Sequence, residues 1–365
     1  MWLAATGFVL SPVSATVNAD DPVSSSVRFN REISRILQRR CVPCHAPGRL
    51  AMSLVAYRDV REWSRAIREE VVEQRMPPAM AAPGYGQFAN ALGLTSRETT
   101  TLLSWLDGGM PRGDEHDLPA PLDLGVGAGS TDPATARIEL PEQTIPALEE
   151  IVVRRVTVDP RLTADRMVTA VVVRPGSREL LRGVLVYTGP GERSWAGAWL
   201  PWQDRFVAPP GRAFRLAKSA PLTVLLYYRG GENQGRDRST IELQFAPPTL
   251  GPLESLRIET VPAASGTATT VATGRLVLKA ATTIWALQPA TEAATQSLEL
   301  RAERLDGSIE VLLWMPTVRL EWPSVLVFQQ PVTLPAGTVL SLTTRRTATT
   351  GASDRVLISA WSESR

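Results

Sequence analysis

The chain has 365 residues, which is long for one ordinary domain and predicts two or three domains. Hydrophobic residues make up 44% of the sequence, as in packed globular proteins, and this excludes a mainly disordered chain. The formal net charge is +2, which excludes a dedicated nucleic-acid-binding protein, because such proteins carry a dominant basic excess.

Residues 1–19 are typical of a secretory signal segment. The apolar run WLAATGFVL is too short to span a bilayer, and Val17-Asn18-Ala19 after it offers a small-residue cleavage pattern. The basic region that normally precedes such a run is missing, so a loosely packed N-terminus is the alternative. We expect an exported, periplasmic protein whose first segment is either cleaved or kept as a membrane anchor.

Both cysteines and one of the two histidines lie in the motif Cys41-x-x-Cys44-His45. This is the attachment pattern of c-type haem. Two thiols at this spacing can each form a thioether with one vinyl group of the porphyrin, and the adjacent imidazole then binds the iron. A structural disulfide, a thioredoxin-like redox site and a zinc site are the alternatives. The redox site wants a βαβ pattern, which is absent here, and a zinc site needs four ligands, for which only His116 remains.

Three segments around the motif have helical periodicity: residues 29–40, 58–74 and 95–109. The third segment opens with Thr95-x-x-Glu98, which is a capping box, and closes on two glycines. Together the three segments predict a small helical cytochrome domain over residues 20–118, with haem at its core.

The iron of such a haem takes a second axial ligand or keeps an open face. Met76 is the first candidate, because it ends the second helical segment and is followed by Pro77-Pro78, which fixes the backbone of the loop. A thioether ligand gives His/Met ligation and a raised reduction potential. Met80 is the second candidate, and for either methionine the alternative is to fill a gap in the core.

Residues 27–117 resemble the monohaem cytochrome domain of many exported bacterial proteins. In that family a helix, the C-x-x-C-H motif and a Pro-Gly pair precede a long helix that ends in Met-Pro-Pro, and a last helix contains a tryptophan. The resemblance implies one covalent haem c, with thioethers from Cys41 and Cys44, His45 as proximal ligand and Met76 as distal ligand. The aromatic residue that usually follows Met-Pro-Pro is Ala79 here.

A Pro- and Gly-rich linker, residues 119–135, leads to a region of different character. Short runs rich in Val, Leu and Tyr, bounded by Pro and Gly, predict two β-sandwich domains over residues 136–248 and 249–365. The fold class predicted for the whole chain is therefore α plus all-β, with a helical cytochrome domain followed by two jelly-roll sandwiches. One loop of the first sandwich predicts either buried packing or an aromatic binding surface, since it contains Trp195, Trp199 and Trp202.

The two sandwiches resemble peptidylglycine monooxygenase, a copper- and ascorbate-dependent enzyme built from two jelly rolls. The segments VVVRPGSRELLRGVLVY, LTVLLYYRG and LQPATEAATQSLELRAERLDGSIEVLL resemble those that carry the family's His-His, His-Tyr-His and His-Met-His ligands. The ligands themselves are missing, and no histidine occurs between residues 117 and 365. Near Trp361 there is no counterpart of the family's terminal methionine ligand. The residues that stand at the other ligand positions are Arg182, Gly183, Tyr227, Tyr228, Arg229, Ala290, Thr291 and Glu292.

Copper redox sites need imidazole and thioether donors, and arginine cannot replace them because it stays protonated. The resemblance therefore implies the fold but argues against copper and against copper catalysis, and we assign no catalytic residue. The sequence predicts an exported protein that carries single electrons on one haem, with the β domains as a binding or docking module. The alternative is an oxidoreductase in which the β domains bind an organic substrate and the haem transfers its electrons.

The charge of the helical region bears on the partner. Residues 28–75 hold 11 Arg against 6 Asp or Glu, which leaves a charge of +5 when His45 is neutral. Such a surplus favours a basic rim that attracts an acidic redox partner, and solvated helix faces explain it equally well. The partner class that we expect is a redox protein, either free or within a membrane-associated electron-transfer complex.

Overall fold

The computed structural model describes residues 25–78, 80–124, 135–147, 150–189, 192, 194–261, 269–291, 295–347 and 353–362. The predicted signal segment, Ala79, Glu292 and most of the predicted linker lie outside these ranges.

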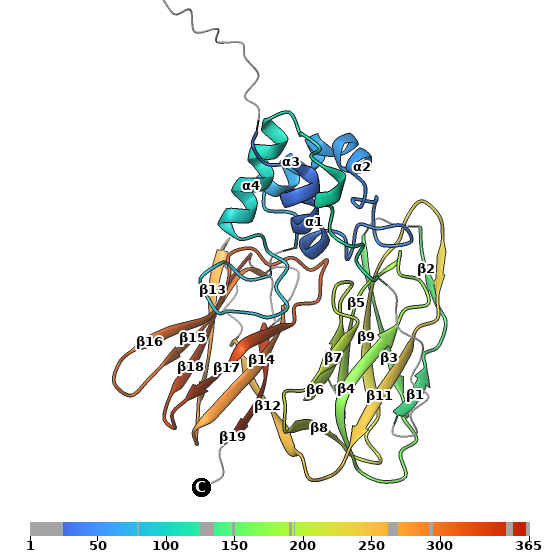
Figure 1. Ribbon diagram of the computed structural model, residues 1–365. Coiled ribbons are helices and arrows are strands. Elements are labelled where there is room, and N and C mark those ends of the chain that lie inside the picture. The colour runs from blue at the N-terminus through green and yellow to red at the C-terminus, as the bar shows by residue number, and fades with distance from the viewer. Residues whose placement is uncertain are drawn as a thin grey trace, which may run out of the picture.

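Strands dominate the molecule, with 44% of the described residues in strands and 14% in helices. Two β-sandwiches lie side by side, and the helices cover one end of the pair (Figure 1). The predicted fold class, with a helical cytochrome domain in front of two sandwiches, is therefore wrong. The protein is mainly a β-sandwich structure. Its short helices form a cap, and this cap packs against the sandwiches.

The helical cap comprises residues 25–124. The helices are η1 (Phe29–Ile33), α1 (Ser34–Arg40), α2 (Tyr57–Glu62), α3 (Ser64–Val72), α4 (Ser96–Asp107) and η2 (Glu115–Asp117). The hydrophobic core of the cap is formed by side chains of η1, α1, α2, α3 and α4 and includes Phe29, Ile33, Leu102 and Trp105. The last long helix begins with the predicted capping box, in which Thr95 Oγ1 accepts from the Glu98 amide at 3.2 Å.

The first sandwich packs two sheets around a core that is rich in valine, leucine and aromatic side chains. Strand pairs are antiparallel throughout. One sheet contains β1 (Thr135–Glu139), β11 (Thr240–Ala246), β4 (Arg166–Arg174) and β8 (Arg212–Leu216), with β7 (Arg205–Val207) against β4. The facing sheet contains β3 (Ile151–Val158), β9 (Leu222–Arg229), β5 (Leu181–Thr188) and β6 (Ser194–Trp199), and a small ribbon pairs β2 (Gln143–Ile145) with β10 (Gly235–Asp237).

The second sandwich shows the alternation expected of strands with one buried face. In β15, Leu298, Leu300 and Ala302 point into the core while the residues between them are more exposed. One sheet contains β12 (Gly251–Glu259), β19 (Arg355–Ser362), β14 (Thr282–Ala290) and β17 (Leu326–Leu334). The other contains β13 (Thr269–Val277), β18 (Val339–Thr347), β15 (Thr295–Glu303) and β16 (Ile309–Met315).

The two sandwiches share one nine-stranded sheet. The join is a short parallel pairing of β12 with β8, in which Gly251, Pro252 and Leu253 face Arg212, Ala213 and Phe214. The predicted domain boundary at residues 248 and 249 lies between β11 and β12. One sheet nevertheless continues across it, because β12 pairs with β8. Backbone hydrogen bonds across the join fix the orientation of one sandwich relative to the other.

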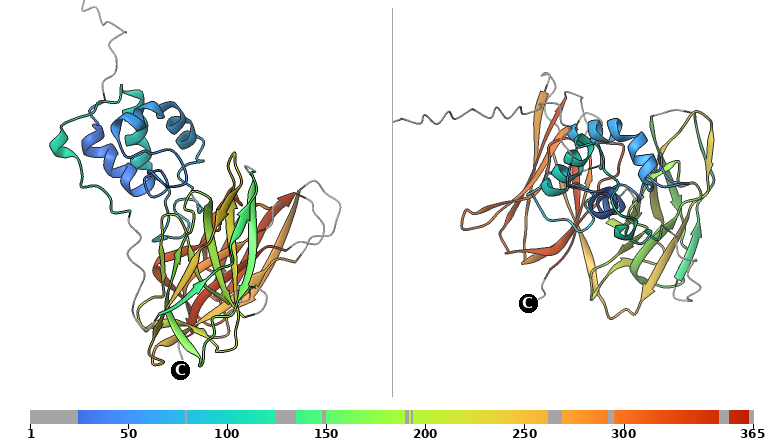
Figure 2. Two further views of the ribbon diagram at one scale, coloured as in Figure 1. Left: turned by 90° about the vertical axis from the view of Figure 1, so that its right-hand side faces the viewer. Right: turned by 45° about the horizontal axis from the view of Figure 1, so that its top comes forward.

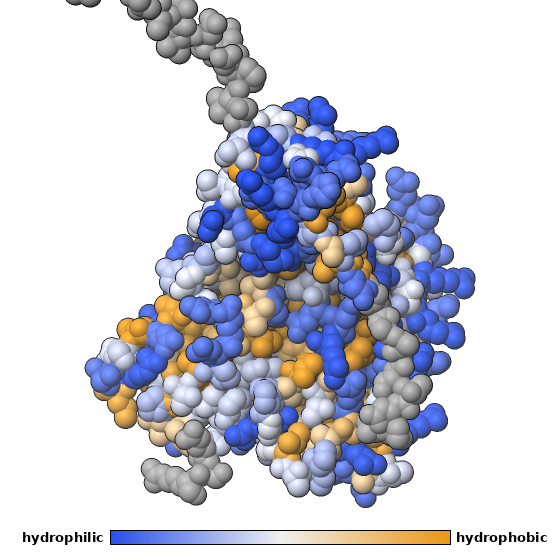
Figure 3. Space-filling model, in the orientation of Figure 1, coloured by the Kyte–Doolittle hydropathy of each residue, from blue (hydrophilic) through white to orange (hydrophobic). Residues whose placement is uncertain are grey.

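The helical cap sits over the junction of the two sandwiches (Figure 2). Its outer face is mainly hydrophilic, whereas apolar patches appear over the strands of the second sandwich (Figure 3). Within the described ranges, no helix has both the length and the apolar character needed to cross a membrane.

A segment of the cap, residues 80–94, reaches down to the sandwiches, and we call it the docking loop. It adds to the edge of β17, with the Ala89 amide donating to the Val327 carbonyl at 2.7 Å and the Gln329 amide donating to the Gln87 carbonyl at 2.8 Å. The rings of Phe88 and Phe328 pack with centroids 4.9 Å apart. This pairing holds the cap in a fixed place above the sandwiches.

Candidate functional site

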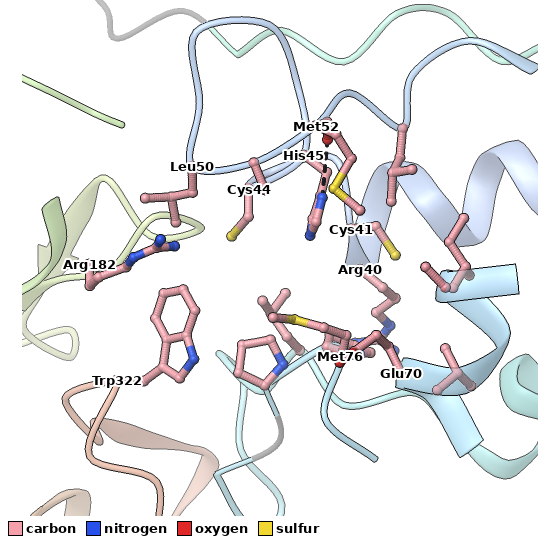
Figure 4. Close-up of a pocket in the computed structure, with 18 of the residues that line it drawn as sticks. Arg40, Cys41, Cys44, His45, Leu50, Met52, Glu70, Met76, Arg182 and Trp322 are labelled. Carbon is pink, nitrogen blue, oxygen red and sulfur yellow. Dashed lines mark hydrogen bonds between the residues drawn. The ribbon is translucent and has the colours of Figure 1, made fainter. Parts of the chain in front are cut away.

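One pocket brings together all four residues that the sequence predicted as a site. Cys41, Cys44, His45 and Met76 line it together with mainly apolar side chains, at the junction of the cap and both sandwiches (Figure 4). The empty space in and around the pocket amounts to about 900 Å³, and this figure includes the solvent at its open mouth.

The motif takes its shape from the end of α1. The amides of Cys44 and His45 both donate to the Cys41 carbonyl, at 3.0 and 2.9 Å. The chain therefore turns tightly after the helix, and the two sulfur atoms and the imidazole all line one cavity. This local turn explains why a five-residue motif can place three side chains around a single bound group.

The thiols of Cys41 and Cys44 are free and buried within this site. Burial raises the pKa of each thiol to about 12, so both stay protonated at neutral pH. A redox dithiol or a reactive cysteine needs the opposite, a thiolate with a lowered pKa. The two cysteines are not joined by a disulfide in this structure.

The imidazole of His45 is held in one orientation. Its Nδ1 lies 3.1 Å from the carbonyl oxygen of Met52, and in the tautomer with the proton on Nδ1 it donates to that oxygen. Nε2 then keeps its lone pair and faces the pocket (Figure 4). Burial lowers the pKa of His45, which favours the neutral form that ligates metals.

The methionines of the cap occupy different places. Met76 projects into the pocket from the wall opposite His45, whereas Met52 lies on the same wall as His45 (Figure 4). Met80 packs against the hydrophobic cores of both sandwiches, and Met110 packs against the core of the cap. Of the two candidates for the distal ligand, only Met76 lines the pocket.

Three residues of the pocket wall come from the sandwiches, and the sequence did not predict them as site residues. Arg182 lies in β5, Arg229 ends β9, and Trp322 lies between β16 and β17. The Arg182 guanidinium packs over the Trp322 ring, with Cζ 5.5 Å from the centroid. The signal available in the sequence was that arginines replace two of the copper ligands of the resembling family.

A second pocket lies between the sandwiches and is more polar. Tyr187 and Tyr227 line it together with Glu192 and Arg355, which form a buried ion pair. Ala290 and Thr291 line it as well. Trp322 lines both this pocket and the first one.

The tryptophan-rich loop does not form an exposed binding surface. Trp195 and Trp199 are buried in the core of the first sandwich, with exposures of 2% and 1%. Trp202 is half-buried, and its indole nitrogen donates to the Asn90 carbonyl of the docking loop at 3.2 Å. The interpretation as buried packing is therefore the one that the structure supports.

A metal centre built from several protein side chains is not found. Within the part of the chain that the structure describes, no group of three or more His, Cys, Asp or Glu residues comes together. His116, the last ligand available for a zinc site, is exposed on η2 beside Asp114. The expectation of a cytochrome fold and of a metal site built from protein side chains is therefore wrong for the described residues, and only the β-sandwich is confirmed. The first pocket offers only one imidazole and one thioether that face each other.

No protein-family model matches the sequence, and no curated protein matches it. Among solved structures, the chain is similar to the major capsid protein P2 of bacteriophage PM2, with 11% identity over 62% of this chain and 98% of that chain, and a TM-score of 0.27. It is also similar to VP54 of PBCV-1, with 10% identity over 65% and 95% of the two chains and a TM-score of 0.22. At TM-scores below 0.5 these similarities carry no inference about this chain. The resemblance to monohaem domains and to copper monooxygenases stays a prediction.

Proposed function

We propose that the first pocket holds one covalent haem and that the protein carries single electrons. The observation that supports this most directly is the convergence of Cys41, Cys44, His45 and Met76 on one mainly apolar cavity. The His45 imidazole and the Met76 thioether line the cavity from opposite walls (Figure 4). A porphyrin supplies four ring nitrogens and leaves two axial positions, which matches this donor set.

The residues of the pocket have distinct roles in this proposal. The Cys41 and Cys44 thiols would hold a haem covalently, each through a thioether to one vinyl group. The Met52 carbonyl orients His45 so that Nε2 would be the atom that binds the iron, and Met76 would be the second ligand. Bound in this way, the haem supplies a site that accepts and releases one electron.

The proposal extends to location and partners. Thioether attachment of haem and a signal-like first segment both fit an exported, periplasmic protein. The sandwiches, which resemble a copper monooxygenase without its ligands, serve as the module that docks a redox partner, free or within a membrane-associated complex. Their shared sheet gives such a partner a rigid surface.

The test is the absorption spectrum of the full-length protein from a host that can attach c-type haem. We expect the spectrum of a haem protein, and we expect the colour to stay on the chain after extraction with acidified acetone. The variant with Cys41→Ser and Cys44→Ser is the control, and it should lose its colour in the same extraction. A wild-type protein that binds no haem, or that releases it to the solvent, contradicts the proposal.

The second pocket supports a second candidate function. It is polar, it lies between the sandwiches, and Trp322 lines both it and the first pocket. An organic substrate oxidised there would give up two electrons and two protons, the protons to water and the electrons one at a time through the haem to an external acceptor protein. Haem reduction by a substrate, without an added protein donor, would favour this oxidoreductase over simple electron transfer.

A further inference from the structure

The charged residues that line the first pocket differ in whether they have partners. Arg40 pairs with Glu98 at 3.1 Å, and Glu70 pairs with Arg75 at 2.9 Å. Arg182 and Arg229, both from the first sandwich, take part in no salt bridge within the described ranges. The two unpaired charges of the pocket are therefore both positive and both lie on the sandwich wall.

The backbone directs Arg182 toward the pocket. The pairing of β5 with β9 shifts register between Leu181 and Gly183, so Arg182 occupies a β-bulge. Bulges leave one residue out of the ladder and re-aim its side chain. Arg229 stands nearby at the end of β9, where its amide donates to the Leu180 carbonyl at 3.0 Å.

The Arg182 guanidinium is an incomplete site. Its Nε is buried and has no hydrogen-bond partner, which is costly unless a ligand supplies the acceptor. Burial and then the charge of Arg229 lower the pKa of Arg182, as expected for two cations held close together away from water. Both features would be relieved by an anion between the two guanidinium groups.

The wider charge distribution at this wall is also positive. Arg49 lies near Cys44 and near Arg178, and the nearby carboxylates are Asp204, which pairs with Arg178 at 2.8 Å, and Glu321, which acts on Arg182. Arg182 rests on the face of Trp322, which limits its movement. A planar guanidinium held in this way suits the two oxygens of a carboxylate.

We propose that Arg182 and Arg229 bind the carboxylate side chains at the edge of the porphyrin. The inference rests on the proposed function, and it deepens it, because it makes the sandwiches part of the haem site rather than a docking module alone. Two arginines that stand where the resembling family has copper ligands would then serve a different cofactor in the neighbouring pocket.

The proposal predicts opposite effects of Arg182→Leu on the two forms of the full-length protein. Without haem, the variant loses an unpaired buried cation, so we expect unfolding at a higher urea concentration than wild type. With haem, it loses a partner of the carboxylate, so we expect unfolding at a lower concentration. A purely structural role for Arg182 would change both forms in the same direction.

The reduction potential gives a second readout. Removal of a positive charge beside the haem disfavours the reduced iron, so Arg182→Gln and Arg229→Gln should each lower the potential. We expect about a tenfold change in the equilibrium constant for reduction, which is 59 mV for a one-electron couple. Arg182→Lys keeps the charge and should recover most of that shift.

The matched control is Arg215→Gln, which removes the same charge from an exposed arginine of the first sandwich that pairs with Asp165. Covalent haem is measured in every variant on a denaturing gel, so a failure of the proposed function shows as colourless wild type. If all variants hold haem, and the Arg182 and Arg229 variants match Arg215→Gln in reduction potential and stability, then these two arginines do not bind the porphyrin carboxylates. A haem-loaded Arg182→Leu that is more stable than wild type overturns it as well.

Discussion

Met76 owes its position to the residues around it. Its amide donates to the Glu70 carbonyl at 3.1 Å, just beyond the end of α3. Two prolines follow it directly in the sequence. Gln74, two residues earlier, takes a positive φ of 54° and reverses the chain toward the pocket. The sequence pointed to this methionine through its prolines, but only the fold shows that Met80 is already engaged elsewhere.

Met76→Ala should therefore remove the distal ligand. We expect the haem-loaded variant to lose the long-wavelength thioether-to-iron band of the oxidised protein and to have a lower potential, since His/Met ligation raises it. Met80→Ala should keep the band and cost about 1–2 kcal/mol of stability, below the 2–5 kcal/mol typical of a fully buried methionine. If Met80→Ala abolishes the band and Met76→Ala leaves it, the assignment is reversed.

The packing around position 183 in β5 gives a reason for a glycine there. A Cβ at this position would lie 2.2 Å from Cγ and 2.7 Å from Cδ of Pro323, which is next to Trp322. The absence of a side chain in β5 lets the loop before β17 close over the pocket. Gly183 is thus a contact residue of the wall that Arg182 and Trp322 form.

Gly183→Ala should displace Pro323 and with it the Trp322 ring. We expect a loss of roughly 1–3 kcal/mol in the free energy of unfolding, as for other overpacked sites, together with a change in tryptophan fluorescence. Gly231→Ala is the control, because no atom lies within 4 Å of a Cβ there. Equal stability of the two variants would show that the loop does not need this contact.

At the level of elements, local patterns in the sequence were a good guide and distant pairings were not. The capping box of α4 depends on two residues three positions apart, Thr95 and Glu98, so it can be read from the sequence. The docking loop pairs with β17, more than 230 residues away, and has no periodicity of its own. The same holds for the sandwich residues of the pocket, which only tertiary packing brings to Cys44.

Asn90 is the residue that ties this loop to both sandwiches. Its Nδ2 donates to Gln203 Oε1 at 3.1 Å in the first sandwich and to the Val325 carbonyl at 2.8 Å in the second. Its Oδ1 accepts from the Val327 amide at 3.0 Å. One half-buried side chain therefore connects the helical cap to both halves of the shared structure.

Asn90→Ala removes all three hydrogen bonds, so the Gln203 side chain, the Val325 carbonyl and the Val327 amide each lose this partner. At about 1 kcal/mol for each bond, we expect a loss of roughly 2–3 kcal/mol in the free energy of unfolding. Hydrogen exchange of the Val327 amide should accelerate more than exchange in the sandwich cores. The control is Asn233→Ala, on an exposed loop. If the two variants have the same stability and the same hydrogen exchange, Asn90 does not hold the cap to the sandwiches.

For the whole molecule, the sequence predicts three separate domains, because the helical region and the two sandwiches each have their own local pattern. The structure instead links them, through β8 with β12 and through the docking loop with β17. The pairing of β8 with β12 is only three residues long and parallel, and no periodicity in the sequence announces it. That is why the predicted class, with a helical domain set apart from the sandwiches, did not survive.

This arrangement also bears on copper. The positions that carry the ligands in the resembling family are divided between two pockets, with Arg182 and Arg229 facing the first while Tyr227 and Ala290 line the second. Neither set offers the imidazole and thioether donors that copper redox sites need. We propose that the sandwiches bind no catalytic copper, and that their strands form the core without a metal.

The haem-loaded full-length protein gives the sharpest test of this last prediction, because its two thiols are then consumed and cannot bind copper adventitiously. After incubation with a copper salt and dialysis, elemental analysis should find iron near one equivalent and copper well below it. The thermal unfolding midpoint should not rise with added copper, since a ligand that binds the folded state raises it. Stoichiometric copper that survives dialysis, or ascorbate-dependent hydroxylation of a peptide, would contradict the prediction and restore a monooxygenase function.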